Sequence, residues 1–147
     1  MKTNVFKNPT VVPEDQWVAA RKELLREEKE FTRLRERLAA KRRALPWVKI
    51  YKAYTFDSPN GPVSLAAMFD GRSQLIVYHF MLGPDWHEGC RSCSFVSDHL
   101  EPTVVHLKAR DVSFAVVSRA PISEIMPFQK RMGWTFNWVS SHRNDFN

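Results

Sequence analysis

The two cysteines of the chain stand two residues apart in the segment GPDWHEGCRSC, residues 83–93, behind a tryptophan, a histidine and two acidic residues. A Cys-x-x-Cys pair suits three roles: a redox-active dithiol, half of a metal site, or two unrelated thiols. When such a pair opens a helix, the first helical turn brings the two sulfurs within bonding distance. The elements around Cys90 and Cys93 therefore decide which chemistry is available.

The sequence on either side of this segment predicts a strand and then a helix. The apolar run QLIVYHFML, residues 74–82, is typical of a buried parallel strand. The residues from Cys93 to about Lys108 predict a helix, which Pro102 interrupts. The loop between them would lie at the carboxyl end of a parallel strand, where open α/β folds place their sites.

This context predicts a reactive thiol. Free N–H groups and the partial positive charge at a helix N-terminus stabilise a thiolate, and Arg91 adds a cation. We therefore expect a lowered pKa for Cys90, which would be the attacking nucleophile. Cys93, one turn deeper, would resolve the mixed disulfide.

Neighbouring side chains are candidates for supporting roles. Asp85 and Glu88 would raise the pKa of a nearby thiolate, but either acid, or His87, could take a proton from Cys93. Trp86 lies in the loop before the dithiol, where an aromatic ring can cover a sulfur.

Two other interpretations stay open. His87, Cys90, Cys93 and His99 are four possible zinc ligands within thirteen residues. Two incidental buried thiols are the third possibility, although Gly89 and the polar loop argue for exposure. The strand, the loop and the helix start favour the dithiol, so we predict no metal and no cofactor.

The second half of the chain continues the alternation. Residues 112–118, VSFAVVS, predict another buried strand, residues 121–133 a helix between Pro121 and Gly133, and residues 134–141 a short extended segment. Upstream, residues 47–56 predict a strand, followed by a turn centred on Asn60–Gly61 and a helical turn ending at Gly71. The pattern predicts an α/β fold with a mixed or parallel sheet flanked by helices.

The motifs LPWVKI, LAAMFDGRSQLIVYHFMLGPDWHEGCRSCSF, VSFAVVSRAP and KRMGWTF resemble a family once catalogued as a domain of unknown function and described as predicted dithiol-disulfide oxidoreductases. The resemblance covers most of the chain. It implies a thioredoxin-like fold near the peroxiredoxin branch, with thiol-disulfide exchange through Cys90 and Cys93. Its expected partners are protein or small-molecule thiols and disulfides.

Two departures from related families qualify this expectation. Peroxiredoxins place Thr or Ser three residues before the reactive cysteine, where this chain has His87, so thiol peroxidase activity is only an alternative function. Arg119 could still serve as a cation near Cys90. No proline follows Pro127 to act as the cis-proline of thioredoxin-like folds, and the sequence stops at Asn147, where the family would continue into its last strands. A zinc-stabilised or non-catalytic thioredoxin-like binding module is the other alternative.

Residues 14–45 predict one long helix, without Gly or Pro, that starts with acids and ends with bases. Its apolar residues recur every seven positions, and about 30 residues span roughly 45 Å, more than the width of a small domain. The positions three residues after each member of this apolar stripe include charged residues, which disfavours pairing of two such helices as a coiled coil. We expect a helical arm, residues 1–45, on a domain of residues 46–147, and a homodimer in which the arm packs on the partner. The stripe consists of Trp17, Leu24, Phe31, Leu38 and Leu45.

Charge and composition narrow the class of protein further. The formal net charge of +6 concentrates in residues 21–43, which hold ten basic and five acidic residues, so nucleic-acid binding is not expected. The N-terminal residues lack the apolar core of a signal peptide, and no apolar run is long enough to cross a bilayer. We therefore expect a cytoplasmic protein with reduced thiols and no membrane partner.

Overall fold

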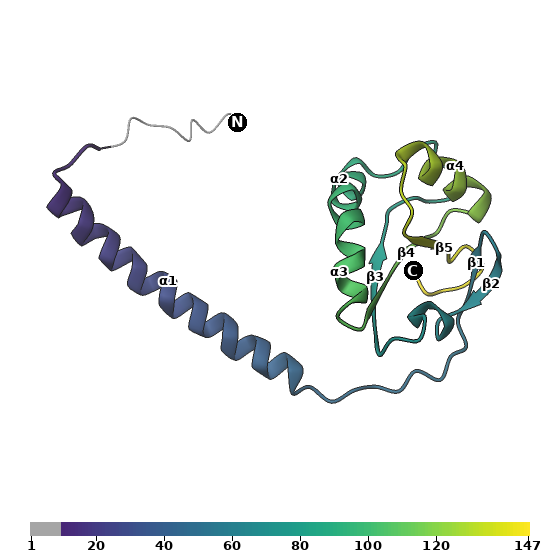
Figure 1. Ribbon diagram of the computed structural model, residues 1–147, viewed down its shortest axis with the longest axis horizontal. Coiled ribbons are helices and arrows are strands. Elements are labelled where there is room, and N and C mark those ends of the chain that lie inside the picture. The colour runs from purple at the N-terminus through teal and green to yellow at the C-terminus, as the bar shows by residue number, and fades with distance from the viewer. Residues whose placement is uncertain (1–9) are drawn as a thin grey trace. The chain divides into compact units, whose positions relative to one another are not determined.

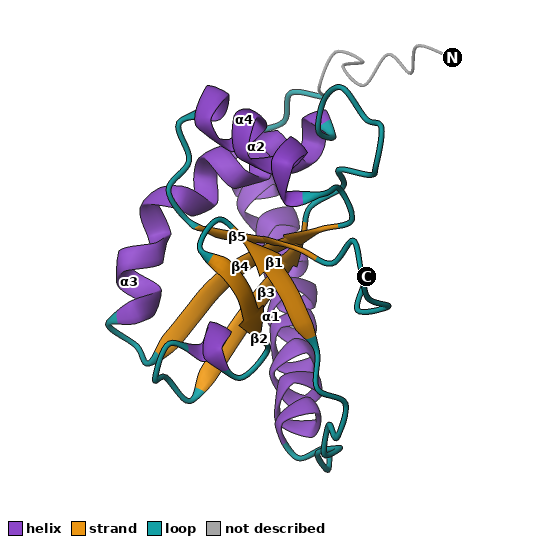
Figure 2. Cartoon of the chain, turned by 90° about the vertical axis from the view of Figure 1, so that its right-hand side faces the viewer, coloured by secondary structure: helices purple, strands orange, loops and turns teal. Residues whose placement is uncertain are grey.

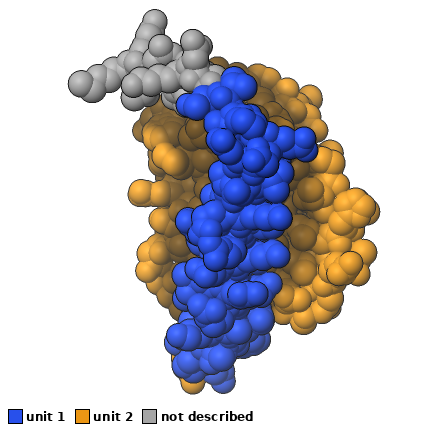
Figure 3. Space-filling model, turned by 90° about the vertical axis from the view of Figure 1, so that its left-hand side faces the viewer, with its two compact units in different colours: residues 1–50 blue, residues 51–147 orange. Residues whose placement is uncertain are grey.

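The computed structural model describes residues 10–147, and the chain divides into two compact units at residue 50 (Figure 3). The first unit contains α1, Glu14–Arg43, a single helix of 30 residues. Pro13 precedes it, Glu14 and Asp15 lie in its first turn, and three basic residues lie in its last. This charge distribution complements the helix dipole, as the sequence predicted.

No residue of α1 is buried, and its apolar stripe is exposed. Trp17 and Phe31 keep 59% and 65% of their surface accessible. A helix gains most of its stability in proteins by packing an apolar face, so this stripe calls for a contact that α1 does not make within its own unit. The homodimer through this helix stays a prediction.

Charging the stripe tests the dimer. The double substitution Leu24→Lys with Phe31→Lys should lower the molar mass measured by analytical ultracentrifugation from dimer to monomer, because two charges would be buried in the contact. Glu30→Lys changes the net charge by the same amount off the stripe, and should leave the dimer intact. A full-length chain that is monomeric at every concentration would contradict the prediction.

The second unit is built on one five-stranded mixed sheet (Figure 1). A hairpin of β1 and β2 forms one side, and β1 joins β5 in antiparallel orientation. The strands β5, β4 and β3 are parallel to one another. The order across the sheet is β2-β1-β5-β4-β3, with β1 at Thr55–Ser58, β2 at Gly61–Ser64, β3 at Gln74–His79, β4 at Val112–Ser118 and β5 at Asn137–Ser140.

Helices connect the parallel strands. Between β3 and β4 the chain forms α2, Arg91–Leu100, a short 3-10 turn that contains Pro102, and α3, Val104–Lys108. Between β4 and β5 it forms α4, Ile122–Met132, which Pro121 precedes and Gly133 ends in a left-handed conformation. These connections confirm the predicted α/β class: a mixed sheet flanked by helices, together with a long N-terminal helix.

The three helices pack on the same face of the sheet (Figure 2). Side chains from α2, α3 and α4 meet an aromatic cluster on this face, around Phe80, Phe128, Trp134 and Trp138. The opposite face carries a smaller cluster, in which Phe146 packs edge-on against Phe56. Apolar burial on both faces fixes the register of the sheet.

Three local predictions were wrong. The strand expected over residues 47–56 begins only at Thr55, and the residues before it are mostly exposed. The hairpin turn lies at Pro59–Asn60, one residue earlier than expected, and opens a strand, β2, that the sequence analysis missed. The strand β3 was expected to be buried, but it lies at the edge of the sheet and is only partly covered.

Among residues 10–147, no helix is both long enough and apolar enough to cross a membrane.

Candidate functional site

The Cys-x-x-Cys segment lies at the start of α2, next to the carboxyl end of β3, as the sequence predicted. Cys90 is the residue that precedes the first turn of α2, and Cys93 is the third residue of that turn. The backbone N–H of Cys90 donates to the carbonyl of Met81, over 3.0 Å, and so ties the helix start to the continuation of β3. The carbonyl of Cys90 accepts from the backbone and the hydroxyl of Ser94.

Gly89 lets Cys90 approach the core closely. A Cβ atom at this position would lie 2.5 Å from Cε1 of Phe80 and 2.9 Å from Cζ of Phe128, distances that side chains do not tolerate. The aromatic cluster is therefore in direct contact with the backbone just before the dithiol. The residue at 89 is constrained by close packing and not by its backbone angles, since it is not among the residues with a positive φ.

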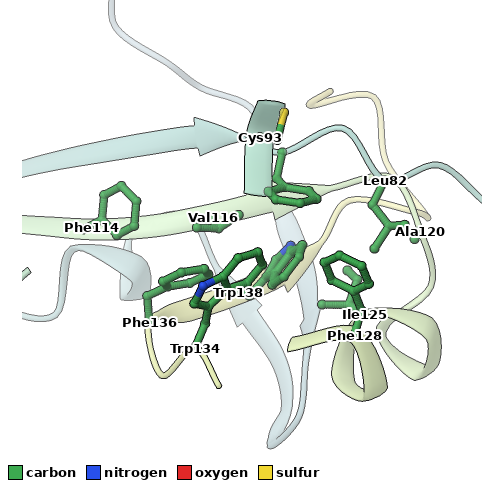
Figure 4. Close-up of a cluster of buried hydrophobic side chains, with 11 residues drawn as sticks. Leu82, Cys93, Phe114, Val116, Ala120, Ile125, Phe128, Trp134, Phe136 and Trp138 are labelled. Atoms are coloured by element: carbon green, nitrogen blue, oxygen red, sulfur yellow. The ribbon is translucent and has the colours of Figure 1, made fainter. Parts of the chain in front are cut away.

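The two thiols differ in exposure. Both are free, with Cys90 partly accessible and Cys93 only 8% exposed. Figure 4 shows Cys93 at the margin of the aromatic cluster, with its sulfur directed away from the rings. This arrangement suits an attacking thiol at the surface and a resolving thiol beneath it.

The pKa of Cys90 is lowered below its ordinary value. The largest cause is the backbone N–H of Cys93, followed by the thiol of Cys93, while the backbone N–H of Ser92 has a smaller effect and partial burial opposes them. These N–H groups belong to the start of α2, and they favour the thiolate form of Cys90. Arg91, the expected cation, is not among the main causes.

Tyr78 is a member of this site that the sequence analysis missed. Burial, and then a hydrogen bond with the thiol of Cys93, raise the pKa of Tyr78 to about 12. The phenol therefore stays protonated at neutral pH and can donate its O–H to the Cys93 sulfur. The only sequence signal was a hydroxyl within an apolar strand, at a position that faces the helices.

The predicted supporting residues are placed less favourably. His87 and Glu88 are exposed, and Glu88 lies 3.5 Å from Arg131 in an exposed ion pair. Trp86 is 47% exposed and its ring lies against Gly83, with Nε1 3.0 Å from where a Cβ of that glycine would be. None of these three side chains forms a hydrogen bond with either sulfur.

Arg119 follows β4 and lines a cavity of about 310 Å³ at the end of β3. Within residues 10–147 its guanidinium has no hydrogen-bond or ion-pair partner. The cavity adjoins Met81, whose carbonyl holds Cys90, so Arg119 is near the dithiol loop without pairing with Cys90. Its lining consists of His79, Phe80, Met81, Leu82, Gly83, Pro84, Trp86, Arg119 and Asn147.

The four possible zinc ligands do not converge. Among the described residues, no group of three or more His, Cys, Asp or Glu side chains is placed to hold a metal ion. His99 turns instead to its own helix, where Nδ1 lies 2.7 Å from the carbonyl of Phe95 and the two rings are 4.4 Å apart. The geometry thus brings together a dithiol and a phenol.

Comparison with protein families gives one match over nearly the whole chain: the model described as "Bacterial protein of unknown function (DUF899)" covers residues 6–147. A comparison with curated proteins found no match. Among solved structures, the chain is similar to the solution structure of a putative protein disulfide isomerase from Bacteroides thetaiotaomicron, at 18% identity and a TM-score of 0.46. That similarity covers 66% of this chain and 58% of the other.

Proposed function

The chain belongs to this bacterial family of proteins of unknown function, and we propose that it is a thiol-disulfide oxidoreductase that acts through Cys90 and Cys93. The observation that carries the proposal is the position of Cys90 at the start of α2, next to a shielded second thiol, and the lowered pKa of Cys90 agrees with it. Lowered thiol pKa values, partial exposure and a nearby resolving cysteine are the features of redox-active cysteines.

The different exposure of the two thiols supports the following reaction. The Cys90 thiolate attacks one sulfur of a substrate disulfide, breaks the S–S bond and forms a mixed disulfide, while the departing thiolate takes a proton from solvent. Cys93 then loses its proton and attacks the Cys90 sulfur, which releases the second substrate thiol. Two electrons pass from the dithiol to the substrate, and an external thiol reductant restores the dithiol.

Tyr78 supports the second step in this scheme. Its hydroxyl, whose pKa is raised by burial and by the Cys93 thiol, stays protonated and is a donor beside the resolving sulfur. The thiol of Cys93 in turn stabilises the Cys90 thiolate before the attack. The pKa values of Cys90 and Tyr78 therefore both depend on Cys93.

Reduction of a disulfide-bonded protein by the full chain, in the presence of a dithiol reductant, tests the function. Cys90→Ser should lower the catalysed rate by about 100-fold or more, because the nucleophile is gone. Cys93→Ser should instead accumulate a mixed disulfide with the substrate, visible by non-reducing electrophoresis and mass spectrometry. The double variant Cys90→Ser with Cys93→Ser is the matched blank, and a wild-type rate equal to that of the blank would contradict the proposal.

A further inference from the structure

The strand β3 has an open edge that leads to the dithiol. In the sheet of residues 51–147, β3 pairs with β4 on one side and with no described strand on the other. It is six residues long, mostly apolar, and contains no proline or lysine that would protect such an edge. Its exposed backbone is therefore free to pair with another extended segment.

The direction of each backbone group follows from two hydrogen bonds. The N–H of Phe80 donates to the carbonyl of Val117, and the carbonyl of Leu82 accepts from Ala120, so even-numbered residues turn their backbone groups toward β4. Because these groups alternate along a strand, odd-numbered residues turn theirs to the open edge. These residues are Leu75, Val77 and His79, and next along the chain Met81.

The last of these outward backbone groups, the carbonyl of Met81, forms a hydrogen bond with the backbone of the candidate nucleophile, Cys90. The carbonyl of Met81 accepts the N–H of Cys90 over 3.0 Å. A strand that paired with Leu75, Val77 and His79 would therefore run directly into the start of α2. The open edge of β3 therefore leads to the backbone of Cys90.

The side chains along this surface indicate what would lie there. Ile76 and Met81, on or just beyond β3, are 44% and 58% exposed, and they favour apolar neighbours. The cavity of about 310 Å³ at the same end has mostly apolar walls. Arg119 at this cavity has no partner among residues 10–147, so an acidic group would complement its charge.

We propose that the open edge of β3 binds an extended, apolar, cysteine-bearing segment of a substrate polypeptide by strand addition and delivers that cysteine to Cys90. The inference rests on the proposed function and names its substrate class: polypeptide disulfides in extended chain, in preference to small disulfides. Backbone hydrogen bonds to Leu75, Val77 and His79 supply sequence-tolerant affinity. Arg119 favours segments with an acidic residue near the cysteine.

The rate of mixed-disulfide formation measures this pairing. In the Cys93→Ser chain, a peptide of about ten alternating Val and Thr residues, with a cysteine at one end, is long enough to pair with all of β3. A capped cysteine without the strand, activated with the same leaving thiol, reports the reactivity of Cys90 alone. We expect the peptide to react about tenfold faster than the capped cysteine, since about two net hydrogen bonds are gained.

Two modifications identify the hydrogen bonds. Val77→Pro removes an outward N–H at the edge without removing a bond to β4, and should bring the rate of the peptide close to that of the capped cysteine. Val77→Ala keeps the N–H and controls for the lost side chain. If Val77→Pro does not fold, two N-methylated peptides make the same test on the Cys93→Ser chain, one methylated at the odd-numbered residues and one at the even-numbered residues. The peptide whose methyl groups replace the N–H groups that face β3 should lose the rate advantage, and the other peptide should keep it.

The outcomes separate the two proposals. Equal rates for the peptide and the capped cysteine, or a peptide advantage that survives Val77→Pro and both N-methylated sets, overturn the edge proposal and leave the oxidoreductase intact. If Cys90 reacts with neither, the proposed function fails. In that case, a fluorescent peptide with serine in place of its cysteine still tests the edge proposal, because its binding to the same variants is measured by anisotropy without any reaction. A concentration-dependent dimer that Val77→Pro dissolves would assign the edge to a second copy and also overturn the proposal.

Discussion

Cys90 is expected to react with iodoacetamide well before Cys93 when the reduced protein is treated briefly at pH 6. Only a thiolate is alkylated rapidly, and an ordinary cysteine with a pKa of about 8.5 is about 0.3% ionised at this pH. The backbone N–H and the thiol of Cys93 lower the pKa of Cys90, so its thiolate fraction at pH 6 is larger. Each unit of lowering raises that fraction about tenfold.

The pH dependence of the alkylation rate shows whether the pKa of Cys90 is lowered. The alkylation rate rises with pH until the thiol is fully ionised, so a lowered pKa moves the midpoint of the profile of Cys90 to a lower pH. Unfolding the protein in denaturant removes α2 and should return the midpoint to about 8.5. Peptide mapping by mass spectrometry assigns the label, and Cys90→Ser should abolish the fast phase. Equal, slow labelling of both cysteines in the folded chain would remove the physical basis of the proposed function.

Gly89→Ala is expected to lower the thermal stability of the protein and to disturb the dithiol together. The added methyl group would lie 2.5 Å from Cε1 of Phe80 and 2.9 Å from Cζ of Phe128, so either the rings or the Cys90 backbone must move. Overpacking of a core costs about 1–3 kcal/mol, and about 2 kcal/mol corresponds to roughly 10 °C in Tm for a domain of this size. Differential scanning calorimetry measures the shift.

Gly83→Ala is the matched control in the same loop. The atoms nearest to its added methyl would be those of the Trp86 ring, with Nε1 at 3.0 Å, and that side chain is 47% exposed and has room to turn. The Tm of this variant should fall by far less. In Gly89→Ala the labelling rate of Cys90 at pH 6 should fall as well, because the sulfur leaves its position before α2. Equal Tm values for the two variants would contradict the packing that the structure shows at Gly89.

The elements of the second unit could largely be predicted because their signals are local. Seven apolar or small residues in a row predict β4, and Pro121 and Gly133 bound α4. The order of a strand, a loop and the Cys-x-x-Cys motif predicted that Cys90 lies at the start of a helix. The groups that lower the pKa of Cys90, in Ser92 and Cys93, are its neighbours in this local sequence. Where burial and capping are decided by neighbours in sequence, the pattern suffices.

The failures concern residues whose environment is set by distant segments. The run of β3 looked like a central strand, but its position at the edge depends on the order of five strands, which no local pattern encodes. The same pairing sends the outward carbonyl of Met81 to Cys90. Residues 47–54 have strand-forming side chains but lie outside the sheet, because β propensity depends on how the side chains pack against their neighbours.

The sequence by itself determined the dithiol, its place before a helix and the α/β alternation, because all three follow from residue type and spacing over short distances. Tertiary structure alone decided the surroundings of the sulfurs. Packing of β3 against α2 brought Tyr78 to Cys93. The contact of the backbone with Phe80 and Phe128 required a glycine at position 89. The fold placed Arg119 at a cavity, where it does not pair with Cys90. These contacts join residues from different elements, and their energies depend on distances that only the folded chain sets.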